Sequence, residues 1–170
     1  MIYPKIEDYF NFIFNDIRNL VYDDTQKPVY EKDTNGLEKL SSILELIKNN
    51  TYYPTFYKKA AYLFIALSTG HYFENGNKRI ALFSYLYFTH RNKYQFRSIR
   101  TKQYKGWLKK YFPKHRLSRH EFYNNIGWAL YNLNKAINIK FEENKKGHKY
   151  NFDKLKEIME EFFQFTSKRK

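Results

Sequence analysis

Residues 70–79, which read GHYFENGNKR, hold the residue types best suited to chemistry. A helix that begins at Gly76 and Asn77 would present backbone N–H groups and the positive end of the helix dipole. Glycine also lets an anion approach the backbone closely. Lys78 and Arg79 would add two positive charges beside these N–H groups. The segment therefore predicts a phosphate-binding site.

A candidate proton acceptor lies five residues before this helix start. Histidine is the side chain that most readily takes up a proton near neutral pH, so His71 is a candidate general base. A base beside a phosphate site predicts the transfer of a phosphoryl or nucleotidyl group to a hydroxyl that His71 activates.

Helices are predicted on both sides of this segment and along most of the chain. Apolar residues recur at steps of three and four, the spacing of amphipathic helices. The predicted helices cover residues 6–20, 37–47, 54–69, 76–90, 101–111, a segment opened by the capping-box pattern of Ser118 to Glu121, and a segment around 155–163. The helix at 76–90 is apolar on nearly all sides. We therefore expect an all-α single domain over 1–170, with about seven helices around this central one.

Composition limits the alternatives. The chain has 170 residues, of which 42% are hydrophobic, and no cysteine, so one domain with its own core is expected and Cys-ligated metal sites are excluded. No apolar run approaches the roughly 20 residues of a membrane span, and no signal peptide is visible, so we expect a cytoplasmic protein. The net charge of +14 comes mainly from residues 91–119, where eleven Lys and Arg occur without an acid.

The phosphate-binding segment resembles the signature of the Fic/Doc family. The matching residues, in order and spacing, are His71, Phe73, Gly76, Asn77, Lys78 and Arg79. Lys78 stands where the adenylylating (AMPylating) branch has a second glycine, and it agrees with the Doc (death-on-curing) branch. A weaker likeness extends over residues 36–94.

The resemblance implies an activity and roles for these residues. It implies a Fic-like fold and transfer of a phosphate-containing group from ATP or another nucleoside triphosphate, with Mg²⁺, to a hydroxyl of a target protein. His71 would be the base, Phe73 the loop anchor, Gly76 with Asn77 the anion hole, and Lys78 and Arg79 the phosphate contacts. Doc-like phosphorylation is favoured over AMPylation because the Lys78 side chain would crowd the diphosphate.

Two further roles are implied by position within the family pattern. Asn75 occupies the place of the metal-binding acid, where its amide oxygen can ligate Mg²⁺ without bringing a charge, and Glu74 is one residue away. A short hairpin before the motif, the flap that docks the target by strand addition, would be formed by Asn49, Asn50, Thr51, Tyr52 and Tyr53.

Alternatives and partners remain open from the sequence. A complete self-inhibitory pattern is not found, so restraint is expected from another chain, such as an acidic antitoxin that binds the basic carboxyl-terminal half. A catalytically silent Fic-fold binding module is one alternative. A nucleic-acid-binding domain that uses the basic segment is another, and it is disfavoured because the motif half carries no excess charge.

Overall fold

The structure is a computed structural model. The structure describes the chain except residues 22, 24–26, 119–124 and 146–151. The described part is almost entirely helical. The elements in chain order are α1 (Ile6–Asp8), a π-helical turn η1 (Tyr9–Ile13), α2 (Phe14–Val21), a 3₁₀ turn η2 (Tyr30–Lys32), α3 (Thr34–Leu46), α4 (Phe56–Thr69), α5 (Asn77–Arg91), β1 (Tyr94–Phe96), α6 (Thr101–Tyr111), α7 (Asn125–Lys145), α8 (Phe152–Thr166) and β2 (Ser167–Arg169). The predicted all-α fold is confirmed.

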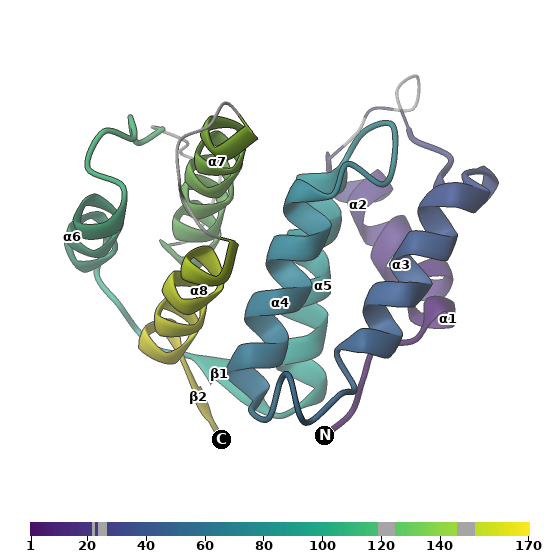
Figure 1. Cartoon of the computed structure of the whole chain (residues 1–170), viewed down its shortest axis with the longest axis horizontal. Helices are drawn as coiled ribbons and strands as arrows, with labels where there is room; N and C mark the ends of the chain where they lie inside the picture. Colours follow the sequence, from purple (N-terminus) through teal and green to yellow (C-terminus); the bar gives the residue numbers. More distant parts are fainter. Residues whose placement is uncertain (22, 24–26, 119–124, 146–151) are drawn as a thin grey trace.

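The helices α4 and α5 lie side by side in the middle of the molecule, with α1 to α3 on one side and α6 to α8 on the other (Figure 1). The sequence singles out α5 as the central helix, but α4 is more completely buried. Its small Ala60, Ala61 and Ala66 allow neighbouring helices to approach from several directions. Aromatic rings fill the space between the layers, as where Tyr85 of α5 stacks on Phe163 of α8 with ring centroids 3.9 Å apart.

Local capping explains where the helices next to the motif begin. Asp33 accepts a hydrogen bond from the Gly36 N–H at the start of α3, and Thr55 accepts one from the Lys58 N–H at the start of α4. Gly76 precedes α5 with φ 77°, in the left-handed region that glycine adopts without strain. The predicted start of the phosphate-site helix is therefore observed.

The hairpin expected at Asn49 to Tyr53 is not formed. Residues 47–53 form turns instead, because the Asn49 side-chain oxygen accepts hydrogen bonds from the N–H groups of Thr51 and Tyr52, at 2.8 and 3.1 Å. The buried Lys59 of α4 fixes the start of this segment, since its Nζ donates to the Ile47 carbonyl at 2.6 Å.

The structure also contains a small sheet that the sequence does not predict. Strand β1 pairs antiparallel with β2 near the carboxyl end, with Tyr94 opposite Arg169 and Phe96 opposite Ser167. The pairing brings the exposed Lys168 and Arg169 next to the basic run that starts at Arg91.

The part of the basic run on α6 carries its lysines on the exposed face and two of its aromatic residues on the buried face. Tyr104 and Trp107 are buried against Phe162 of α8. These rings cannot stack on nucleic-acid bases, which weakens the nucleic-acid alternative. The capping-box pattern after Ser118 lies outside the described residues. Within the described chain, no helix has the length and apolar character needed to cross a bilayer.

Candidate active site

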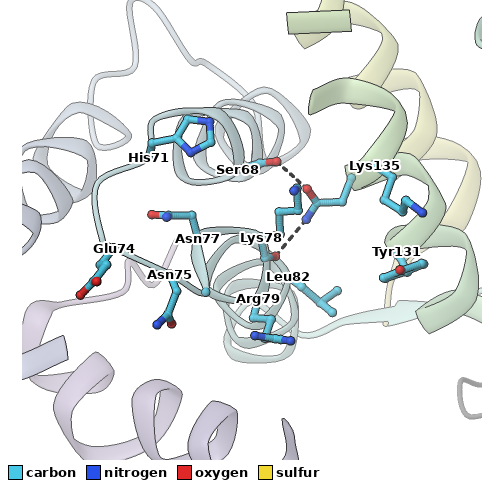
Figure 2. A pocket seen from close by; sticks show the side chains of 12 residues that line it. Ser68, His71, Glu74, Asn75, Asn77, Lys78, Arg79, Leu82, Tyr131 and Lys135 are labelled. Atoms are coloured by element: carbon cyan, nitrogen blue, oxygen red, sulfur yellow. Dashed lines mark hydrogen bonds between the residues drawn. The ribbon is translucent and has the colours of Figure 1, made fainter. Parts of the chain in front are cut away.

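The predicted motif lines a cavity of about 390 Å³ between the loop that follows α4, the first turns of α5, and α7 (Figure 2). This volume lies in the usual range for small-molecule sites. The motif contributes His71, Glu74, Asn75, Gly76, Asn77, Lys78 and Arg79 to the lining, and the other lining residues are Ser68, Leu82, Tyr131, Asn134 and Lys135. The structure therefore brings the candidate base and all four candidate phosphate-binding residues to one cavity.

The Asn77 side chain fixes the shape of the motif loop. Its oxygen accepts from the Phe73 N–H at 3.0 Å and its amide nitrogen donates to the Phe73 carbonyl at 2.6 Å. Both hydrogen bonds are buried. Only an amide side chain can make this pair of hydrogen bonds, since it must donate and accept at once. Asn77 therefore acts on the site mainly by holding the loop against the start of α5.

Packing around Phe73 holds the same loop from the other side. The Phe73 ring is buried and packs edge-on against Phe14 and Tyr30, as expected for the loop anchor. The first turn of α3 touches the loop as well, because a Cβ built on Gly36 would lie 2.7 Å from the Tyr72 carbonyl oxygen and 2.8 Å from the Phe73 ring. The close approach requires a residue without a side chain at Gly36.

His71 lies at the open side of the cavity. Its side chain is 59% exposed, and its Nε2 lies 3.8 Å from a carboxylate oxygen of Glu142 on α7. Its backbone has φ 46°, an unusual conformation for a residue with a side chain and one that is often found at functional sites. An exposed imidazole at the cavity can accept a proton from an incoming hydroxyl.

A buried polar network ties α7 to the start of α5. Asn134 donates from its amide nitrogen to the Lys78 carbonyl at 2.9 Å. Its amide oxygen accepts from the Ser68 hydroxyl at 2.6 Å and from the Asn138 amide at 3.0 Å, which fixes the direction in which the amide points. Asn138 also donates to the Ser68 hydroxyl at 2.7 Å. The network joins α4, α5 and α7 directly beneath the predicted phosphate site.

The cavity carries a positive electrostatic character on its α5 and α7 sides. Lys78 and Arg79 line it from the first turn of α5, where the helix dipole also favours an anion. Lys135 lines it from α7, with its Nζ 5.5 Å from the centre of the Tyr131 ring. Leu82 and the Tyr131 ring supply apolar wall. Such a lining suits a ligand with a polyphosphate at one end and a flat apolar group at the other.

Comparison with known proteins agrees with this geometry. Residues 9–89 match the Fic/DOC family. The match supports assignment to the Fic/DOC family and covers the candidate base, the phosphate-binding residues and the helices on both sides of them. No curated protein and no solved structure shows significant similarity to the chain.

The Mg²⁺ that Fic/DOC proteins typically use finds few protein ligands in this cavity. Glu74 offers one exposed carboxylate and Asn75 one exposed amide oxygen, and both point away from Tyr131 and Lys135 (Figure 2). Among the described residues, no group of three His, Cys, Asp or Glu side chains could hold a metal. Mg²⁺ commonly binds through one or two protein oxygens and substrate phosphates. The residues therefore fit a Mg²⁺ ion that arrives with a nucleotide.

The predicted docking segment is not part of the cavity. Asn49 to Tyr53 precede α4, whereas the motif follows it, and the 14 residues of that helix separate the two by roughly 20 Å (Figure 1). The described residues that border the motif loop are instead Tyr30 and the start of α3.

Sequence reasoning missed the contribution of α7 to the site. Tyr131, Asn134, Lys135 and Glu142 all lie near the motif, but they follow it by more than 50 residues. The repeated asparagines Asn132, Asn134 and Asn138, buried within an otherwise apolar helix pattern, are the signal that could have indicated a functional face.

Proposed function

We propose that this chain transfers a phosphate-containing group from a nucleoside triphosphate, ATP being the first candidate, to a hydroxyl of a target protein. The observation that carries the proposal is the convergence of His71, the α5 start and two cations on one cavity. The Fic/DOC match supports the same class of reaction.

The proposed roles follow from the positions of the residues. The nucleotide phosphates would lie at the start of α5, held by backbone N–H groups after Gly76 and by Lys78 and Arg79. The acceptor hydroxyl would approach from the open side, where His71 Nε2 takes its proton as the hydroxyl oxygen attacks phosphorus. Mg²⁺, when bound with the nucleotide, would neutralise phosphate charge.

Protein phosphorylation is favoured over AMPylation. In phosphorylation the acceptor oxygen bonds to the γ-phosphorus, the bond from the γ-phosphorus to the β–γ bridging oxygen breaks, and ADP leaves. In AMPylation the α-phosphorus is attacked and pyrophosphate leaves. The Lys78 side chain lines the cavity and occupies space that a glycine would leave to the diphosphate, which favours the first orientation.

Two labelled nucleotides distinguish these reactions. The chain is incubated with Mg²⁺, cell lysate and ATP labelled at either the α or the γ phosphate. Label on protein from γ-labelled ATP alone supports phosphorylation, and label from the α position supports AMPylation. Transfer from neither, by wild type and His71→Ala alike, would argue for a silent binding module, the alternative that the uncharged Asn75 favours.

We also propose that an acidic partner chain, such as an antitoxin, inhibits the activity of this chain. The exposed cations of α6 offer it a surface, since Lys102, Lys105 and Lys109 face solvent and make no ion pair with a described residue. Because the surface is electrostatic, binding should weaken steeply with salt.

A further inference from the structure

A second hollow lies beside the motif cavity, between α7 and the loop that follows α6. It has a volume of about 700 Å³, and its lining residues are His115, Arg116, Leu117, Ser118, Lys135 and Ile139. Lys135 also lines the motif cavity. The two spaces are therefore neighbours that share one cation of α7.

The loop that forms this hollow is held firmly on α7. The Ser118 N–H donates to the Asn132 side-chain oxygen at 2.8 Å, and the Ser118 carbonyl accepts from the Trp128 indole N–H at 2.8 Å. The Lys135 Nζ donates to the Ser118 hydroxyl at 3.2 Å. Three hydrogen bonds from one residue to three side chains of a helix fix the loop without regular secondary structure. Side chains on such a loop are preorganised.

The lining is positively charged and lacks a described counter-charge. Arg116 and Lys135 carry full charges, and no acid occurs among the residues that line the hollow. The Nε2 of His115 is buried and has no hydrogen-bond partner among the described residues. Burial, followed by the Lys135 charge, lowers the pKa of His115, while a hydrogen bond with Asn132 acts in the opposite sense. An anion would compensate the gathered charges and give the Ser118 hydroxyl and His115 an acceptor.

We propose that this hollow is a second oxyanion site, which binds a phosphate group next to the nucleotide cavity. The phosphate can come from free inorganic phosphate or from a further phosphate on the nucleotide, such as a ribose 3′-phosphate. The first source is independent of the proposed transfer reaction. The second rests on the proposed function, because it requires a nucleotide in the motif cavity.

Inorganic phosphate is the probe for the site itself. Phosphate is titrated while the imidazole resonances of His115 are followed by NMR, assigned with a His115→Gln variant. Phosphate binding should shift these resonances and raise the pKa of His115. Arg116→Gln should weaken phosphate binding to this site about tenfold, the loss of one charge-assisted hydrogen bond. Lys114→Gln is the matched control, since Lys114 is an exposed cation of the same loop outside the hollow, and it should leave binding unchanged.

A third variant distinguishes phosphate binding in the hollow from ATP binding in the motif cavity. Arg79→Gln should weaken ATP binding and leave the His115 response to phosphate intact. Unshifted His115 resonances, or equal losses in Arg116→Gln and Lys114→Gln, would overturn the second site even if label transfer from ATP is observed.

A nucleotide comparison tests the second source. If the hollow takes a nucleotide phosphate, adenosine 3′-phosphate 5′-diphosphate should bind more tightly than ADP to the wild type, and Arg116→Gln should remove the difference. Equal affinities of the wild type for the two nucleotides, with an intact response to free phosphate, would assign the hollow to free phosphate.

Discussion

At the residue scale, the two asparagines of the motif, Asn75 and Asn77, have different roles. Asn77 is buried and holds the Phe73 backbone through two hydrogen bonds, whereas its neighbour Asn75 is exposed at the cavity. The sequence pattern assigns Asn77 to the anion hole. The structure shows that its side chain is committed to the loop, so only its backbone N–H remains for an anion.

Replacing Asn77 with aspartate should damage the loop. Asn77→Asp keeps the acceptor for the Phe73 N–H but places a carboxylate against the Phe73 carbonyl, where the amide now donates at 2.6 Å. We expect a loss of about 1–3 kcal/mol in the free energy of unfolding, measured in urea, and nucleotide affinity reduced about tenfold or more by calorimetry.

The exposed Asn75 provides the control for the added charge. Asn75→Asp adds the same charge two residues away and should change stability by less than about 0.5 kcal/mol. Equal destabilisation by the two substitutions would mean that the added charge explains the effect, and not the loss of the hydrogen bonds between Asn77 and the Phe73 backbone.

At the element scale, two packing contacts position the site: α3 against the motif loop, and α7 against the start of α5. The helices that carry these contacts follow from their apolar periodicity, and the α5 start follows from Gly76. The contacts themselves could not be predicted. They join segments distant in the chain, and the Asn134 side chain gives no sign in sequence that it bonds to the Lys78 carbonyl.

Two glycines within helices should respond oppositely to alanine. Gly36→Ala places its Cβ within 2.8 Å of the motif loop, so it should destabilise the protein by about 1–3 kcal/mol and weaken nucleotide binding. Gly106→Ala meets no atom within 4 Å and should stabilise α6 by about 0.5–1 kcal/mol. Thermal unfolding of both variants tests this, and stabilisation by both would contradict the close approach at Gly36.

The hydrogen-bond network around Asn134 predicts that two substitutions with similar effects on stability will differ in their effect on ATP affinity. Asn134→Ala and Asn138→Ala should each destabilise the protein by about 1–3 kcal/mol, because each leaves buried polar groups unpaired. Only Asn134→Ala removes the bond to Lys78, so only it should also reduce ATP affinity severalfold. Urea unfolding and calorimetry on the two variants decide the point, and parallel losses of ATP affinity would show that the network merely stabilises the fold.

At the scale of the whole molecule, charge and aromatic content follow from the sequence, but their placement does not. The basic run could be located by counting, whereas the burial of Tyr104 and Trp107 and the addition of Lys168 and Arg169 by β2 required the structure. A three-residue strand in a basic terminus has no strand signal, since its pairing depends on β1 seventy residues earlier. The segment at Asn49 to Tyr53 forms turns in place of the expected hairpin, because the Asn49 side chain accepts hydrogen bonds from the N–H groups of Thr51 and Tyr52.

The buried and half-buried tyrosines predict loss of stability at alkaline pH. Burial raises the pKa of Tyr62, Tyr87 and Tyr104 to about 12, from a reference of 10.0, and it raises the pKa of Tyr9 and Tyr85 as well. Above pH 10 the unfolded chain loses phenolic protons that the folded chain retains, so stability should be intact below about pH 10 and fall between about pH 10 and 12.

The buried Lys59 changes the pH dependence of stability in the opposite direction. Burial lowers its pKa, so its own contribution to stability rises with pH up to its reference of 10.5, but five tyrosines should outweigh one lysine. Urea unfolding across this pH range measures how the free energy of unfolding changes with pH. A stability that stays constant or rises above pH 10 would be inconsistent with the buried phenols.

The comparison of wild type with His71→Ala tests the central claim most directly. Label transfer from ATP to protein and ATP affinity are measured for both at equal nucleotide occupancy. Because His71 lies at the open side of the cavity and is proposed to accept the hydroxyl proton, the variant should lose about 10²–10⁴-fold in transfer rate while ATP affinity changes less than about threefold. A variant that transfers label as fast as the wild type would contradict the account.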